Sequence, residues 1–150
     1  MKREENLSSL SNIVKRILKH NMNHKLFSSD EKKTYFPEHN KGPRIISLDQ
    51  ESNFHCLTVI LDGISENHLI RSLDKLSKHK TEYPHWQHKL FIKYRPSFER
   101  FKSHYDMLIS YYKEYEIEVY YVTTDGKYCD FIKNNMPNKV TRTHKKTLLW

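Results

Sequence analysis

Five polar residues follow apolar runs of the chain, at places where their side chains could contact a ligand. They are Asp62, Arg95, Ser97, Thr123 and Asp125. The guanidinium of Arg95 can donate a fork of hydrogen bonds to a phosphate group, and an aspartate can hold a ribose hydroxyl or a metal ion. Backbone N–H groups at a predicted helix start near Ser97 favour phosphate or carboxylate. The alternative is that Asp62-Gly63 and Arg95-Pro96 are only turns.

Three apolar runs precede these polar residues, and each is typical of a buried strand. They cover residues 56–61, 89–94 and 117–122. Helical patterns begin near Ser65 and near Ser97, where apolar residues recur in steps of three and four. Strands that alternate with helices predict a β-α-β-α-β core with a parallel sheet. Ligands bind outside the carboxyl ends of such strands, so a phosphate-bearing ligand is expected at that edge.

Other patterns add elements around this core. An apolar stripe at helical spacing predicts an N-terminal amphipathic helix: Leu7, Leu10, Val14, Ile17 and Leu18. We expect this helix to pack on the sheet, with an acidic membrane surface as the alternative. Residues 20–43 are polar and interrupted by proline and glycine, which predicts a long connection.

Two hairpins are predicted beside the parallel strands. Residues 44–48 and 54–61 flank one turn, and Thr124-Asp125-Gly126-Lys127 form the other. The fold class is therefore a single three-layer-like α/β domain with a mixed sheet of four or five strands. It should comprise residues 1–132, followed by a basic C-terminal tail at 133–150.

The charge of the chain favours a polyanionic partner. The formal net charge is +8, and from Phe131 onward no aspartate or glutamate occurs. Cations can meet phosphates while aromatic side chains stack on unpaired bases, including Tyr120 in the predicted sheet. The candidate nucleic-acid contacts are Lys127, Tyr128, Lys133, Lys139, Arg142, Lys145 and Lys146. No motif for sequence-specific recognition is present, so DNA and RNA are equal candidates.

Histidines offer two further chemistries. The ten histidines include the pairs His20/His24 and His85/His88, whose spacing could hold zinc if a third ligand joined. A nuclease-like set could combine His55 with His144 and its neighbours, because phosphodiester cleavage needs acid–base groups and cations. Chance pairing is the alternative, so no cofactor or metal is expected and no catalytic residue is assigned.

The two cysteines, Cys56 and Cys129, both lie in predicted strands. They are too few for a disulfide scaffold, so we expect free buried thiols, with a single bridge as the alternative. No stretch approaches the roughly 18 apolar residues of a membrane span, and no signal-peptide core follows the N-terminus. A cytoplasmic protein is expected.

The segment LTVILDGISENHLIRSLDKL at residues 57–76, followed by TEYPHWQHKLFIKY, resembles the opening of a family 2 glycosyltransferase of the GT-A type. The family begins with a strand, a leucine-rich helix, a "Q-T-Y-P-x-W-E" turn and a second strand. Its acidic metal motif has no counterpart here, since Tyr94-Arg95-Pro96-Ser97 stands in that place. The resemblance implies a nucleotide-sugar binder with a Rossmann-like sheet.

Three functional hypotheses follow. The leading one is a small nucleic-acid-binding protein without strong sequence specificity. The first alternative is a small or degenerate nucleotide-sugar-binding domain that uses Asp62, Arg95 and Asp125. The second is a protein-interaction factor from a virus or mobile element.

Overall fold

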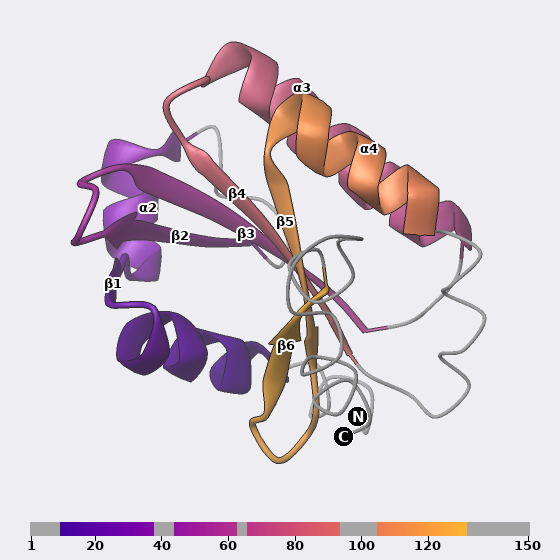
Figure 1. Ribbon diagram of the computed structural model, residues 1–150. Coiled ribbons are helices and arrows are strands. Elements are labelled where there is room, and N and C mark those ends of the chain that lie inside the picture. The colour runs from indigo at the N-terminus through magenta and orange to yellow at the C-terminus, as the bar shows by residue number, and fades with distance from the viewer. Residues whose placement is uncertain (1–9, 38–43, 63–65, 94–104, 132–150) are drawn as a thin grey trace.

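The computed structural model describes residues 10–37, 44–62, 66–93 and 105–131. These residues form a mixed sheet of six strands in the order β1-β2-β3-β4-β5-β6, with helices on both faces (Figure 1). The predicted α/β class is confirmed. The predicted number of four or five strands is wrong, because the sheet gains a short strand at one edge.

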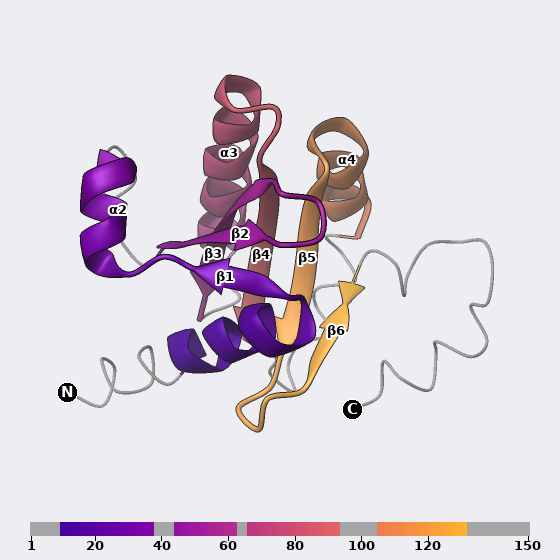
Figure 2. The same cartoon turned by 90° about the vertical axis from the view of Figure 1, so that its left-hand side faces the viewer.

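The centre of the sheet is the predicted parallel core. It consists of β3 (His55–Leu61), β4 (Gln87–Lys93) and β5 (Ile117–Val122), joined through α3 (Glu66–Glu82) and α4 (Tyr105–Tyr115). Both crossovers move in the same direction across the sheet, and right-handed crossovers of this kind leave their helices on one face. Figure 2 shows α3 and α4 side by side on that face.

Antiparallel strands extend the core on both sides. β2 (Arg44–Asp49) pairs with β3, and β6 (Tyr128–Asp130) pairs with β5, so both predicted hairpins are confirmed. The strand that the sequence did not predict is β1 (His24–Leu26), which pairs with β2. A strand of three residues is too short to show a recognisable alternation.

The segment predicted as a long connection is partly ordered structure. After β1 it forms α2 (Ser29–Tyr35), which begins with a capping box between Ser28 and Glu31. The Ser28 hydroxyl accepts a hydrogen bond from the Glu31 amide, and the Glu31 carboxylate accepts one from the Ser28 amide. The S-x-x-E spacing of this motif was readable in the sequence. The prediction of a connection is wrong here because Pro37, Gly42 and Pro43 all follow α2 and so do not interrupt it.

Two cores lie on opposite faces of the sheet. The N-terminal helix, residues 10–16 and the π-helical turn η1 (Ile17–Asn21), packs through Leu10 and Val14 on the face that includes Phe91 and Tyr120. This confirms its predicted packing on the sheet. The other face buries Leu90 and Ile92 of β4 beneath α3 and α4, among other residues. None of the helices in the described ranges combines the length and apolar character needed to cross a membrane.

Candidate functional site

The carboxyl edge of the parallel strands places Asp62 directly after β3. Its carboxylate lies 3.7 Å from the ammonium of Lys93, the last residue of β4. Both side chains are partly exposed. Lys93 lies opposite Val122 of β5 in the strand register. Lys93 therefore adds to the middle of this edge a cation that the sequence analysis had not placed there.

Thr123 and Asp125 are found together in the turn between β5 and β6. The Thr123 hydroxyl donates a hydrogen bond to the Asp125 carboxylate and accepts one from the Lys127 amide, at 3.1 Å. The bond from Thr123 holds the pKa of Asp125 below its ordinary value. This carboxylate therefore stabilises the turn. Strands lie about 4.8 Å apart, so Asp62 and Thr123, two strands from each other, are separated by about 10 Å.

The predicted ligand set is thus only partly assembled by the described residues. Asp62, Thr123 and Asp125 share one edge, as the parallel topology requires. Asp62 pairs there with Lys93, however, while Thr123 and Asp125 bond to each other. Arg95 and Ser97, with the helix start near Ser97 and the one near Ser65, lie outside the described residues.

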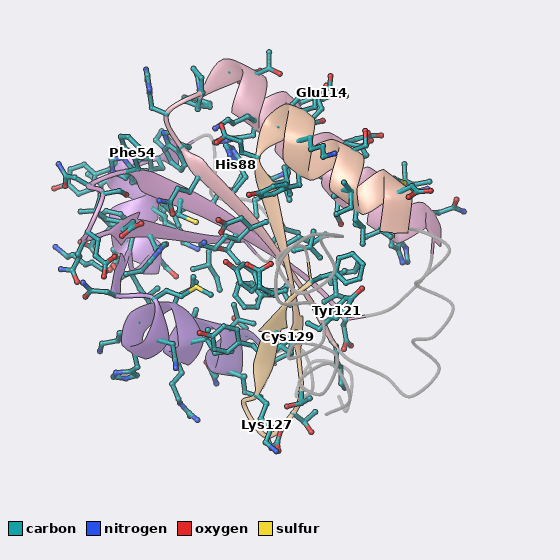
Figure 3. The ribbon with its side chains drawn as sticks, in the orientation of Figure 1. Phe54, His88, Glu114, Tyr121, Lys127 and Cys129 are labelled. Atoms are coloured by element: carbon teal, nitrogen blue, oxygen red, sulfur yellow. The ribbon has the colours of Figure 1, made fainter. Side chains whose placement is uncertain are left out.

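The β5–β6 hairpin carries two of the predicted nucleic-acid contacts. Lys127 is exposed at its tip, and Tyr128 is half-buried. Figure 3 shows Lys127 at the end of the sheet opposite His88. The ring of Tyr128 packs edge-on against Tyr120, with 6.1 Å between the ring centroids. Tyr120 itself is only 6% exposed, so the prediction that it stacks on bases is wrong.

The other predicted nucleic-acid contacts belong to the tail. Lys133, Lys139, Arg142, Lys145 and Lys146 lie outside the described residues, as does the predicted boundary of the tail at 132/133. The described surface nevertheless adds cations to the same sheet face. Tyr128 packs against the cluster of the N-terminal helix, which exposes Lys15, Arg16 and Lys19.

The histidines form different pairs from those expected. His24 is buried and shares a 2.8 Å hydrogen bond with Ser47, while His88 shares one of 2.8 Å with His79 of α3. His88 is therefore paired across the sheet–helix interface. Within the described ranges, no three histidine, cysteine or acidic side chains are arranged to hold a metal ion.

Burial shapes the chemistry of these histidines. Burial of the His88 ring lowers its pKa to about 3, and the nearby His79 and Lys80 contribute to the same shift. His55 belongs to an aromatic stack, with 5.1 Å between its ring and that of Trp86. The nuclease-like set would need His144 beside this stack, and His144 lies outside the described residues.

Sequence reasoning missed a buried polar network on the face covered by the N-terminal helix. Lys89, 6% exposed, forms an ion pair with Glu118, and the Tyr120 hydroxyl donates a 2.9 Å hydrogen bond to the same carboxylate. Lysine in the middle of an apolar strand was a readable signal, because a buried ammonium needs a partner. The identity of that partner depended on the strand register.

Both cysteines are free and buried, as predicted. Burial raises the pKa of the Cys56 thiol to about 11, so it remains protonated near neutral pH. Cys56 lies 3.6 Å from the hydroxyl of Thr58. The Cys56 thiol is therefore suited to packing and not to nucleophilic chemistry.

Comparisons with known proteins provide no relative from which a function could be inferred, so the functional proposal depends on the geometry described above. No protein-family model, no curated protein and no solved structure matches the chain.

Proposed function

We propose that the protein binds nucleic acid without strong sequence specificity, through the basic segment 133–150 together with Lys127 of the β5–β6 hairpin and the exposed cations of the N-terminal helix. The observation that carries the proposal is an uneven distribution of charge. The described residues contain 15 lysines and arginines against 14 aspartates and glutamates, a formal net charge of +1 out of +8 for the whole chain. The excess positive charge therefore resides in the other segments.

The C-terminal segment accounts for most of that excess. Its five cations are Lys133, Lys139, Arg142, Lys145 and Lys146, with no acidic residue among them. A cluster of this kind can neutralise backbone phosphates and release their counterions, whatever the base sequence. Lys15, Arg16 and Lys19 provide further exposed cations on a face that also holds Tyr128.

The test compares two triple variants with the same loss of charge. Arg142→Gln/Lys145→Gln/Lys146→Gln removes tail cations, and Lys25→Gln/Lys33→Gln/Lys113→Gln removes exposed cations elsewhere. Fluorescence anisotropy with labelled single-stranded DNA, single-stranded RNA and duplex DNA is measured from about 50 to about 200 mM salt. We expect the tail variant to reduce the salt slope by about 3. Equal losses in the two variants, or no binding by the unaltered chain in about 50 mM salt, would reject the proposal.

A second candidate is a nucleotide-sugar-binding domain at the carboxyl edge of the parallel strands. It is favoured by the parallel order of β3, β4 and β5, because such sheets bind ligands at that edge. Thermal unfolding with nucleotide sugars and Mg²⁺ or Mn²⁺ tests it, since a ligand that binds only the folded chain raises Tm. An unchanged Tm across the set would eliminate this candidate.

A further inference from the structure

A concave surface lies between α3 and β2, and β2 is three strands away from β5 and its hairpin in the sheet order. Its cavity measures about 230 Å³, and Leu57, Val59 and Leu76 provide an apolar floor. Lys75 and Lys78 of α3 line one side, and Arg44 of β2 lies opposite. We call this surface the α3–β2 groove. Figure 2 shows α2 beyond α3 on the side away from α4.

Three cations line the groove, and none of them takes part in an ion pair within the described residues. Among the described residues, the ion pairs involve Lys80, Lys89 and Lys93, and neither Arg44 nor the two groove lysines take part. Lys75 and Lys78 are exposed, and Arg44 is half-buried.

Another cation lies beside the strand end at Arg44, outside the lining of the groove. Lys32 of α2 donates a 3.2 Å hydrogen bond to the backbone carbonyl of Arg44. Burial, followed by the nearby Lys15, lowers the pKa of Lys32. Glu82 is the acidic residue in the lining. Three cations against one carboxylate in the lining of a concave surface favour an anionic ligand.

The size and shape of the groove restrict that anion. A cavity of about 230 Å³ lies below the usual range for drug-sized ligands, about 300 to 1,000 Å³, so it favours a small ligand or the end of a larger one. The side chain of Tyr83 lines the groove, and its ring is stacked on His79 at 4.5 Å between centroids. An apolar floor and an aromatic wall beside the cations fit a phosphate group joined to one planar ring system.

We propose that the α3–β2 groove binds a phosphate monoester carrying a planar ring, with Arg44, Lys75 and Lys78 as the anion contacts. A free nucleoside monophosphate and the 5′-terminal nucleotide of a strand both have this chemistry. The site does not depend on the C-terminal segment, so it stands or falls separately from the proposed nucleic-acid interface.

The experiment titrates the full chain with adenosine monophosphate, guanosine monophosphate and the corresponding nucleosides, using calorimetry and thermal unfolding. We expect the monophosphates to bind and to raise Tm, and the nucleosides to do neither. Lys75→Gln/Lys78→Gln should weaken binding about tenfold or more, because it removes two charge-assisted contacts. The charge-matched control Lys33→Gln/Lys113→Gln should bind as the unaltered chain does.

A second variant tests the shape of the groove without changing its charge. Val59→Tyr places a ring on the floor and should abolish binding, and an unchanged circular dichroism spectrum verifies the fold. Oligonucleotides with a 5′-phosphate or a 5′-hydroxyl distinguish the two sources. If the chain prefers the 5′-phosphate oligonucleotide and the groove variants lose that preference, the ligand is a strand terminus. If the two oligonucleotides bind equally well, the ligand is the free mononucleotide. No binding of either monophosphate, or equal affinity in Lys75→Gln/Lys78→Gln and the control, would overturn the proposal.

Discussion

Lys89 and Glu118 lie directly opposite each other on the parallel strands β4 and β5 and form an ion pair on the face that packs against the N-terminal helix. Burial opposes the charge of the ammonium, but Glu118 and the neighbouring Cys56 raise the pKa of Lys89 overall. The Lys89 ammonium also lies 5.3 Å from the ring centroid of Tyr120. The charged form of Lys89 is thus stabilised inside the fold.

Replacing the carboxylate should therefore leave a buried charge without its counter-charge. We expect Glu118→Gln to reduce the free energy of unfolding by about 2 to 3 kcal/mol, less than for a fully buried pair because Glu118 is partly exposed. Urea unfolding at neutral pH measures this change. Glu116→Gln alters a 78% exposed partner of Lys80 and serves as the control, with an expected change below about 1 kcal/mol. Lys89→Met/Glu118→Leu should recover part of the loss, because it removes both charges although the Tyr120 hydroxyl loses its acceptor, and a double variant as unstable as the single one would contradict this account.

The buried His88 predicts how stability depends on pH. Its pKa is about 3 in the fold, below the ordinary value of about 6.5 expected in the unfolded chain. Between these two pH values the unfolded chain binds a proton at His88 that the folded chain does not bind. The stabilisation due to neutral His88 is therefore fully present above about pH 6.5 and is lost as the pH is lowered. Within that pH window the free energy of unfolding falls by up to about 1.4 kcal/mol for each pH unit. Urea unfolding from pH 7 to pH 5 measures it.

The matched variants are His88→Gln, which cannot titrate, and His20→Gln, which changes an exposed ring. His88→Gln should flatten the pH dependence, and His20→Gln should leave it unchanged. A residual slope is expected from His24, whose pKa is also lowered, mainly by burial and then by Lys89. An unaltered slope in His88→Gln would show that His88 is not the responsible group.

Glu116 follows α4 in the left-handed backbone region, with a φ of 57°. Its amide donates a 2.8 Å hydrogen bond to the carbonyl of Tyr112, which closes the end of the helix. A residue with a Cβ is disfavoured by about 1 kcal/mol there, and glycine is not. We expect Glu116→Gly to stabilise the protein by about 0.5 to 1 kcal/mol despite losing the exposed pair with Lys80. A raised Tm by calorimetry checks this, and Glu116→Ala should lack the gain.

The two thiols should be protected from reagents while the chain is folded. Cys56 is fully buried with its pKa raised to about 11, and Cys129 is 7% exposed. We expect a chromogenic disulfide reagent to react with both thiols rapidly in about 6 M urea and at least about 100-fold more slowly in buffer. Cys129→Ser reports on Cys56 alone. Rapid reaction of that variant in buffer would contradict the burial of Cys56.

The parallel core could be predicted because its strands are continuous apolar runs. Burial on both faces leaves a strand such as β5 without polar interruptions, and the helices between the strands show their own period. The hairpin at Gly126 was equally readable, since its φ of 92° suits glycine. These are local signals, and local signals survive in a single sequence.

Features that depend on strand register could not be predicted. The sequence contains Lys89 and Glu118 but says nothing of their pairing, which follows from the offset between β4 and β5. The same holds for the α3–β2 groove, where Arg44 lies opposite Lys75 and Lys78 although 31 or more positions separate them. The Asp62–Lys93 pair could not be predicted either, because its two residues lie at the ends of different strands and meet only once β3 and β4 are paired.

The sequential order of the strands has a consequence for how the chain is made. Among the described residues, no strand waits for a partner from a distant part of the sequence, because each one joins the strand synthesised just before it. Short-range pairing of this kind lowers the entropy lost on closing loops and speeds folding. The sheet can therefore grow one strand at a time as the chain leaves the ribosome, with its newest strand always at the open border.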